Sequence, residues 1–383
     1  MKILFVTPYF YPVKGGAENV LFFLAKELVK RGHEINILTS DLDRDKRISK
    51  KIEYIDGIRI KRLKAYFKLG NFVAFFPSVF YEIMKTDYDI MHIHGYRHPH
   101  NLIVFLTNKP KFITSHWPEY PRKVRGNLLS IAASFFDILI GKIILNRCVY
   151  ICADTMPEAE WYIKKFNIKE DKVALVSLGI PKEYLKLRNP KIFRKKLNIK
   201  DEEIIISSLS RLHKSKGLDI LIRSAKYFPD VKFVIAGAKA GYENELKILI
   251  NKLGLKNITI MENLSDEEKL QLLSASDIFV HPSYYDAFGI TILEAFSQNN
   301  AVIASHSGGI PWVINEAGLT FKTGNVKDLK FKLGILIKDK KYRENLAKKG
   351  RERIKQFVWE EITSNQEYLY NKAIEKHDQS LSL

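Results

Sequence analysis

The chain alternates short apolar runs with longer stretches in which apolar side chains recur at helical spacing. Residues 2–7 are an apolar run that ends in a loop rich in proline and glycine, residues 18–31 show the helical spacing, and residues 34–40 are apolar again. This order predicts a strand, a helix and a second strand. Further strands are expected at residues 90–94, 112–115 and 149–153. Nearly continuous apolar strands separated by helices are typical of a parallel sheet covered on both faces.

A second series of the same kind follows a basic, proline-containing stretch at residues 182–200, which we interpret as a linker and a short helix. Its expected strands are residues 204–208, 232–236, 258–261, 278–281 and 301–305. The pattern predicts an α/β protein with two doubly wound, Rossmann-like domains, residues 1–185 and 186–359, and a final helix in residues 360–383 that packs back on the first. Such sheets bind ligands beyond the carboxyl ends of their strands, so two facing sheets are expected to enclose a cleft.

The composition and net charge limit the classes of molecule that the protein is expected to bind. A length of 383 residues suits two domains, and 46% hydrophobic with 27% charged residues is typical of a folded protein. The net charge of +19 favours nucleic acid, an anionic membrane or phosphorylated small molecules as partners. Because the basic residues are scattered and match no zinc-finger, basic-zipper or RNA-binding motif, no nucleic acid is expected. The amino terminus lacks a cationic leader, which predicts a cytoplasmic protein.

Residues 128–151 are strongly apolar but are interrupted by Asp137, Lys142 and Arg147, so they fall short of a membrane span. Two interpretations stay open. The segment is a core helix that leads into the strand at residue 149, or it is an amphipathic face that contacts the inner face of an anionic cell membrane. In the second interpretation the face also includes Arg122, Lys123, Arg125 and residues 72–76.

Three loops carry candidate chemistry. Gly15 and Gly16 immediately precede a helix, where backbone amides can approach a phosphate or a sugar hydroxyl. A structural turn that uses glycine for its dihedral angles explains them equally well. The loop does not match G-x-G-x-x-G, which disfavours hydride-transfer enzymes.

In the second loop, Arg211 and Lys216 follow a strand and precede a helix. Two cations beside a helix amino terminus suit a diphosphate, and a solvated basic loop is the alternative.

The third loop and its helix, residues 281–296, have the sequence HPSYYDAFGITILEAF. Asp286 lies in the loop, and Glu294 follows eight residues later inside the helix. Carboxylates accept paired hydroxyls well, and Gly289 lets backbone amides come close to a ligand. The pattern suits a ribose and a sugar ring. A capping aspartate and a solvated helical glutamate are the alternative.

Taken together, these motifs make the whole chain resemble the retaining glycosyltransferase family 4, which has the GT-B fold. That family has a motif of two glutamates separated by seven residues, with Phe-Gly after the first and alanine after the second. The corresponding residues here are Asp286, Phe288, Gly289, Glu294 and Ala295. Its Arg-Leu and Lys-Gly pair is matched by Arg211-Leu212 and Lys216-Gly217, and its Gly-Gly-Ala-Glu by Gly15, Gly16, Ala17 and Glu18.

The resemblance implies a role for each matched residue. Arg211 and Lys216 would hold the donor diphosphate, Glu294 the ribose hydroxyls, and Asp286 hydroxyls of the transferred sugar. Backbone amides would complete the phosphate site at Phe288, Gly289, Ile290 and Thr291. The resemblance also implies that His116 reaches the donor sugar, although a structural histidine is the alternative. Asp286 departs from the family, which usually has glutamate there, and this leaves the donor sugar in doubt.

The function implied is transfer of a sugar, with retention of anomeric configuration, from a UDP- or GDP-sugar to a glycan or to a polyprenyl- or other lipid-linked acceptor. Arg211 and Lys216 would stabilise the leaving diphosphate, so neither a metal nor a cofactor is expected. A nucleotide-sugar epimerase of the same fold and a non-catalytic protein that binds sugar nucleotides or a membrane surface stay as alternatives. A glycosidase is disfavoured, because it needs two carboxylates opposed across a substrate groove.

Overall fold

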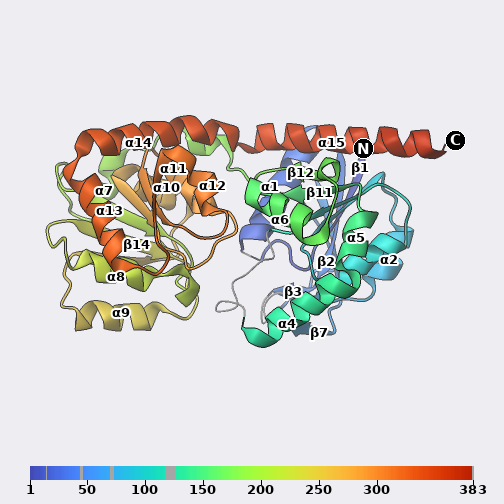
Figure 1. Ribbon diagram of the computed structural model, residues 1–383, viewed down its shortest axis with the longest axis horizontal. Coiled ribbons are helices and arrows are strands. Elements are labelled where there is room, and N and C mark those ends of the chain that lie inside the picture. The colour runs from blue at the N-terminus through green and yellow to red at the C-terminus, as the bar shows by residue number, and fades with distance from the viewer. Residues whose placement is uncertain (14, 44–45, 70–72, 117–125, 382–383) are drawn as a thin grey trace. The chain divides into compact units, whose positions relative to one another are not determined.

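The computed structural model describes residues 1–13, 15–43, 46–69, 73–116 and 126–381. The chain divides into two compact units, one formed by Met1–Leu178 with Trp359–Leu383 and the other by Gly179–Val358 (Figure 1). Near the start of the second unit, the backbone N–H of Ile180 donates to the carbonyl of Phe357, 2.9 Å away, and an isolated bridge pairs Ile180 with Val358. Arg122, Lys123, Arg125 and Phe72 lie outside the described residues.

The first unit is built on an eight-stranded sheet with the order β12-β11-β10-β9-β1-β2-β6-β5. The strands are β1 (Lys2–Val6), β2 (Glu34–Ser40), β5 (Ile52–Ile55), β6 (Ile58–Leu63), β9 (Ile90–His94), β10 (Lys111–Thr114), β11 (Tyr150–Ala153) and β12 (Val173–Leu175). Two small hairpins add β3 (Leu42–Asp43), β4 (Lys46–Arg47), β7 (Phe67–Leu69) and β8 (Val73–Phe75). The central strands are parallel and buried, as the sequence predicts, but β5 pairs antiparallel with β6 at the sheet edge.

Helices cover this sheet on both faces. They are α1 (Gly16–Lys30), α2 (Val79–Lys85), α4 (Asn127–Phe136), α5 (Lys142–Arg147), α6 (Met156–Phe166) and α15 (Trp359–Leu381), with a π-helical turn at Asp137–Gly141 and 3₁₀ turns at Pro99–Phe105 and Glu170–Lys172. The carboxy-terminal helix α15 contacts α1. Arg31 after α1 binds Glu367 of α15 at 3.0 Å, and the hydroxyl of Tyr370 lies 2.6 Å from His92 Nδ1 on β9. The last helix is therefore part of the first unit.

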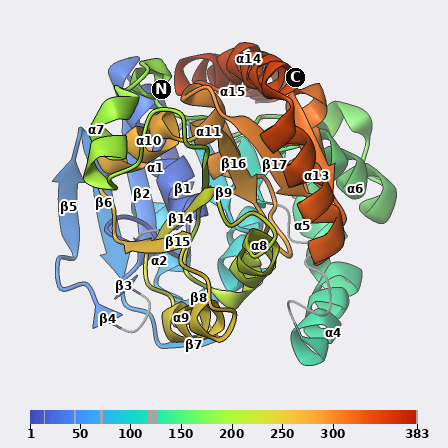
Figure 2. The same cartoon turned by 90° about the vertical axis from the view of Figure 1, so that its left-hand side faces the viewer.

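The second unit has a six-stranded, wholly parallel sheet with the order β15-β14-β13-β16-β17-β18. Its strands are β13 (Ile205–Leu209), β14 (Lys232–Gly237), β15 (Ile258–Glu262), β16 (Ile278–His281), β17 (Ala301–Ser305) and β18 (Gly318–Phe321). Its helices are α7 (Pro190–Lys196), α8 (Leu218–Ala225), α9 (Glu243–Lys252), α10 (Asp266–Ala275), α11 (Ile290–Ser297), α12 (Ile310–Ile314), α13 (Val326–Lys338) and α14 (Lys340–Arg353), with short 3₁₀ turns between them (Figure 2).

The structure of residues 128–151 agrees only in part with their interpretation as a core helix. It forms α4, the π-helical turn and α5. Only its end is a core helix, because Ile144 and Leu145 are fully buried in the core of the first unit. Upstream, Phe135 and Ile138 are exposed. The whole segment was expected to be core in the first interpretation, and that is wrong for its first half.

Candidate active site

Lys216 and Asp286 meet at the carboxyl edge of the second sheet. Lys216 ends the 3₁₀ turn Lys214–Lys216 between β13 and α8, and Asp286 lies between β16 and α11. β13 and β16 are adjacent and parallel, so the loops that follow them leave the same edge. Lys216 Nζ donates to Asp286 Oδ2 at 2.7 Å. The sequence analysis assigned these two side chains to different parts of the donor, and the structure brings them into direct contact.

His281, which the sequence analysis did not select, links this pair to the next helix. Its Nε2 lies 3.2 Å from Asp286 Oδ2, and its Nδ1 lies 3.1 Å from Thr291 Oγ1 in the first turn of α11. Burial opposes ionisation of Asp286, but Lys216 and His281 outweigh burial and hold the pKa of this carboxyl well below its usual range. Asp286 is therefore an anion held by two partners. His281 could have been recognised in the sequence as the polar residue at the end of an otherwise apolar strand.

Two glycines let the backbones of neighbouring loops approach this group. Gly217 has φ +61°, and a Cβ built on it would lie 2.1 Å from the carbonyl oxygen of Pro282. Gly308 has φ +55°, and its Cβ would lie 2.0 Å from the carbonyl oxygen of Asp286. Residues with a Cβ rarely adopt this left-handed conformation, and neither contact leaves room for one. The loop of Lys216 and the loop of Asp286 are thus fixed by close backbone packing.

Arg211 is exposed in the loop that follows β13. Burial lowers the pKa of His213, and the charges of Arg211 and then Lys216 lower it further. Both cations therefore lie close enough to His213 to act on it, and their binding of a diphosphate stays a prediction.

The amino terminus of α11 faces the same loops. Gly289 precedes the helix with φ +87° and, as a glycine, offers no side chain to cap the first turn, which contains Ile290 and Thr291. Backbone amides at a helix start favour an anionic ligand. Phe288 is buried and its ring lies 5.9 Å from that of Phe357, which anchors the loop.

Glu294 lies within α11, partly buried and apart from the Lys216–Asp286 pair. Burial raises the pKa of its carboxyl to about 7, Lys269 lowers it and Asp266 raises it. Glu294 is only partly exposed, so it is not a fully solvated helical glutamate, and its contact with a ribose stays a prediction.

In the first unit, His116 follows β10 with φ +57°, and it belongs to a chain of polar contacts. Its Nδ1 lies 2.9 Å from Asp154 Oδ2, and its Nε2 lies 3.3 Å from His94 Nδ1. Burial lowers the pKa of His116, but Asp154 more than offsets burial, so the pKa is raised. His92 is fully buried between Thr114 and Tyr370, and burial lowers its pKa to about 3, as expected of a packing residue.

Gly15 and Gly16 lie at the start of α1. The backbone there does not have the positive φ that would require glycine in a structural turn. Gly15 is extended at φ −158°, a conformation that any residue adopts. A Cβ at Gly16 would meet nothing within 4 Å. A Cβ at Gly15 would lie 2.0 Å from Glu18 Oε2, so the close approach of that side chain gives Gly15 a structural reason, and the approach of a ligand to the two glycines stays a prediction.

Two family models match the chain in tandem. Residues 14–184 match Glycosyltransferase Family 4, and residues 190–353 match Glycosyl transferases group 1. The chain belongs to the group 1 glycosyltransferases of family 4. It is therefore an enzyme that transfers a sugar from a nucleotide-sugar donor, and the family predicted from its motifs is confirmed.

Individual relatives and a solved structure agree with this assignment. An uncharacterized glycosyltransferase of Methanocaldococcus jannaschii is 25% identical over 98% of this chain and 99% of its own length. The N,N'-diacetylbacillosaminyl-diphospho-undecaprenol alpha-1,3-N-acetylgalactosaminyltransferase of Campylobacter jejuni is 31% identical over 56% of this chain and 58% of its own. The crystal structure of Anabaena HepE in complex with UDP and glucose superposes with a TM-score of 0.75 and 18% identity over 97% of this chain and 100% of that one. The predicted GT-B fold is confirmed.

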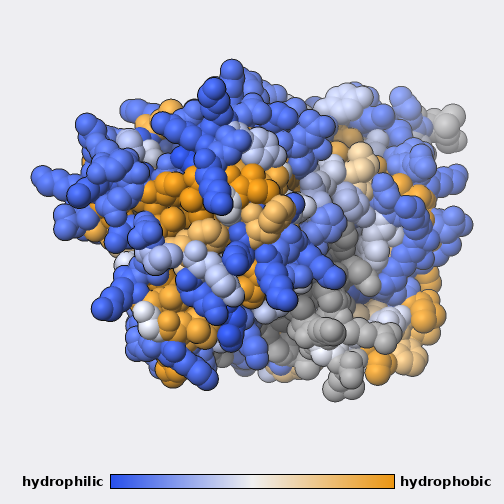
Figure 3. Space-filling view, turned by 60° about the vertical axis from the view of Figure 1, so that its left-hand side comes forward, coloured by the Kyte–Doolittle hydropathy of each residue, from blue (hydrophilic) through white to orange (hydrophobic). Residues whose placement is uncertain are grey.

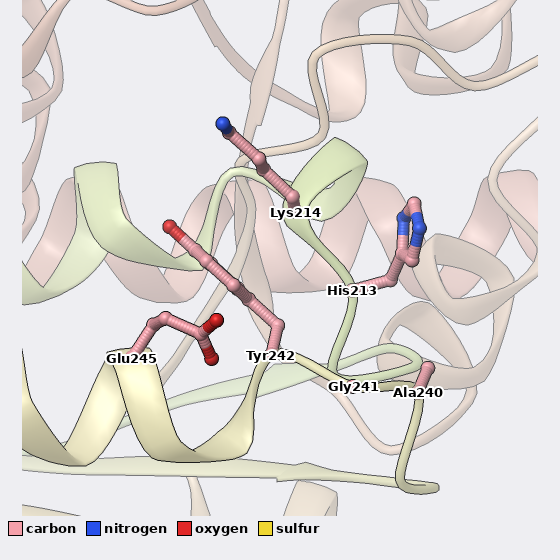
Figure 4. A pocket seen from close by; sticks show the side chains of 6 residues that line it. All are labelled: His213, Lys214, Ala240, Gly241, Tyr242 and Glu245. Carbon is pink, nitrogen blue, oxygen red and sulfur yellow. The ribbon is translucent and has the colours of Figure 1, made fainter.

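A surface pocket of about 450 Å³ opens at the loop that carries Lys214 (Figure 4). It is lined by His213, Lys214, Ala240, Gly241, Tyr242 and Glu245. None of these is among the predicted donor contacts, although Lys214 belongs to the same 3₁₀ turn as Lys216. Among the described residues, no group of three or more His, Cys, Asp or Glu side chains is placed to hold a metal ion.

The raised pKa of Glu294 predicts a pH-dependent stability. The folded protein favours the neutral carboxyl up to about pH 7, whereas the unfolded chain ionises it near pH 4.5. Wild type therefore loses stability between these values relative to Glu294→Gln, which is uncharged at every pH. The variant should melt roughly 2–4 °C higher at pH 8, equal to about 1 kcal/mol, and at the same temperature as wild type at pH 4. Thermal unfolding at both pH values tests this, and an equal difference at both would contradict it.

Proposed function

We propose that this glycosyltransferase retains anomeric configuration and moves a sugar from a UDP- or GDP-sugar to a glycan or lipid-linked acceptor without a metal ion. The observation that carries the proposal is the contact of 2.7 Å between Lys216 Nζ and Asp286 Oδ2 beside the start of α11. A diphosphate is the stronger partner for a lysine, because it carries more charge than one carboxylate. When the donor binds, Lys216 Nζ would therefore exchange its contact with Asp286 for one with the phosphates. Asp286 could then accept hydrogen bonds from sugar hydroxyls.

The same residues supply the chemistry of bond cleavage. When the bond between the anomeric carbon and the diphosphate breaks, negative charge grows on the leaving phosphate. Lys216, Arg211 and the amides at Ile290 and Thr291 lie along one sheet edge and would stabilise that charge. Fixed cations perform the role that a divalent metal has in other transferases. Glu294 would accept the ribose hydroxyls, and its neutral form can also donate a hydrogen bond.

The first unit would supply His116, Gly15 and Gly16. His116 is held by Asp154, which orients the ring and favours its protonated form. Its two ring nitrogens lie against Asp154 and His94, so a hydrogen bond from Nε2 to a hydroxyl of the donor sugar would replace the contact with His94. We assign acceptor binding to this unit, residues 1–178 with the terminal helix, and donor binding to residues 179–358.

The relatives support the classes of donor and acceptor. HepE is a structure with UDP and glucose, which favours UDP over GDP as the carrier here. The Campylobacter transferase is named for a sugar linked through a diphosphate to undecaprenol, which favours a polyprenyl-linked acceptor.

Donor profiling tests the proposal. Purified protein is incubated with UDP-, GDP- and ADP-sugars, with EDTA and with or without polyprenyl-diphosphate acceptors. We expect slow hydrolysis of one UDP-sugar in EDTA and faster consumption with an acceptor. Interconversion of the free donor sugar without hydrolysis would indicate the epimerase alternative, and tight binding with no turnover of any donor would indicate a binding protein.

Asp286→Glu probes the contact with the transferred sugar. The longer side chain moves the carboxylate by about one methylene, so we expect the order of preference among UDP-sugars to change while the affinity for UDP itself stays within about threefold. The measurement is kcat/KM for each donor and Kd for UDP. An unchanged order of preference would place the sugar away from Asp286.

A further inference from the structure

A row of apolar side chains along α4, the π-helical turn and α5 is exposed to solvent. Their exposed fractions are 54% for Ile131, 61% for Phe135, 79% for Ile138, 70% for Leu139 and 52% for Ile143. We call these five residues the apolar ridge. Their spacing of four, three, one and four residues places them on one side of a continuous helical rod.

The opposite side of the same rod already packs on the core. Ile144 and Leu145 are fully buried, and Phe136 and Ile140 pack against the core of the first unit. The rod is thus apolar on both sides, and a soluble protein normally buries such a helix completely. In Figures 1 and 2, α4 stands at the margin of its unit.

The ridge continues onto a neighbouring element. The 3₁₀ turn Pro99–Phe105 contacts α5 and exposes Leu102 and Phe105, at 37% and 40%. The guanidinium of Arg147, at the end of α5, lies 5.6 Å from the ring of Phe105. Two elements that are distant in sequence therefore contribute to one apolar surface with a cation at its edge.

The exposed charges on these two segments are positive. Across residues 98–109 and 126–147 the only acidic residue is Asp137. It is 5% exposed and its Oδ2 accepts from Arg97 at 2.6 Å and from Lys165 at 2.7 Å. Lys142 and Arg147 are exposed. The neighbouring 3₁₀ turn Glu170–Lys172, whose Lys172 donates to the carbonyl oxygen of Asn146 at 2.7 Å, adds two exposed acids beside the end of α5, Glu170 and Asp171. A helical strip that is apolar and carries exposed cations but no exposed acid of its own has the character of a helix that lies in the interface of an anionic bilayer.

We propose that the apolar ridge inserts into the headgroup region of an anionic phospholipid surface, with Lys142 and Arg147 contacting lipid phosphates. The attachment is peripheral, since no helix among the described residues is long and apolar enough to span a bilayer. The proposal goes beyond sugar transfer, because binding to lipid requires neither a donor nor an acceptor. Failure of lipid binding would leave the proposed reaction untouched, and the reverse also holds.

Co-sedimentation with vesicles tests the proposal. Wild type should bind vesicles of equal parts phosphatidylglycerol and phosphatidylcholine at least tenfold more tightly than pure phosphatidylcholine. Ile138→Ser with Leu139→Ser should weaken that binding by at least tenfold, since each apolar side chain contributes through the area that it buries. Lys142→Glu with Arg147→Glu should abolish the preference for the anionic vesicles.

A matched control uses apolar side chains exposed elsewhere, which the face in Figure 3 also shows as patches. Ile248 on α9 is 64% exposed and Phe331 on α13 is 63% exposed, so Ile248→Ser with Phe331→Ser removes a similar apolar area. This control should bind vesicles like wild type. Equal losses in the control and ridge variants, or no binding by wild type, would overturn the proposal. So would a wild-type dimer in lipid-free sedimentation that the ridge variant converts to monomers, because a second copy would then cover the ridge.

Discussion

Replacing Lys216 with alanine is expected to lower kcat for sugar transfer by at least about a hundredfold, the size of effect seen when one preorganised charge stabiliser is removed. Lys216 is partly buried, with its Nζ 2.7 Å from Asp286 Oδ2. Its loss removes the cation nearest the leaving phosphate and leaves Asp286 with His281 as its one recorded side-chain partner among the described residues. Both effects oppose the development of negative charge on the diphosphate.

The matched control is Lys214→Ala. Lys214 belongs to the same 3₁₀ turn, but it is exposed and lines the neighbouring pocket. Its variant should keep kcat within about twofold, because an exposed charge is screened by solvent. Steady-state rates with donor at saturation, together with thermal unfolding to verify the fold, distinguish the two variants. Equal rates for Lys216→Ala and wild type would show that the diphosphate binds elsewhere.

The sequence predicts the strands that are mostly apolar. It misses strands near the edge of a sheet, where the pattern of apolar and polar residues is less regular. β1 and β17 are nearly continuous apolar runs, β9 and β13 each have two polar residues among five, and all four were expected. In β6, basic residues alternate with Ile58 and Ile60 at the side of the sheet, and the short β18 starts with a glycine. From the sequence alone, neither segment can be distinguished from a loop, because its assignment as a strand depends on the strand that it pairs with.

The candidate site shows the same limit. The motifs predict Lys216 and Asp286 as ligand residues, but their contact joins loops seventy residues apart and depends on β13 lying beside β16. His281 and Asp154 likewise act through partners that only the sheet order supplies. For α4, hydrophobicity alone does not say which side of a mostly apolar helix is covered. The contacts in the site could not be predicted because a single sequence does not give the order of the strands in a sheet.

Gly217→Ala should impair both stability and catalysis. Alanine at φ +61° costs roughly 1–2 kcal/mol for the left-handed conformation alone. Its Cβ would also lie 2.1 Å from the carbonyl oxygen of Pro282, which belongs to the backbone and cannot rotate away. The two loops must separate, and this separation moves Lys216 from Asp286. We expect a loss of about 3 kcal/mol or more in the free energy of unfolding and a fall in kcat of at least about tenfold.

Gly254→Ala separates the two causes. Gly254 has a similar φ of +64°, but a Cβ there would meet nothing within 4 Å. This variant should therefore lose only the conformational part, roughly 1–2 kcal/mol, and keep the wild-type kcat. Urea unfolding and donor turnover of both variants give the comparison. If Gly217→Ala behaves like Gly254→Ala, the backbone contact with Pro282 does not position Lys216. A larger loss in Gly217→Ala alone would mean that the geometry of the diphosphate site depends on the absence of one methyl group between two neighbouring loops.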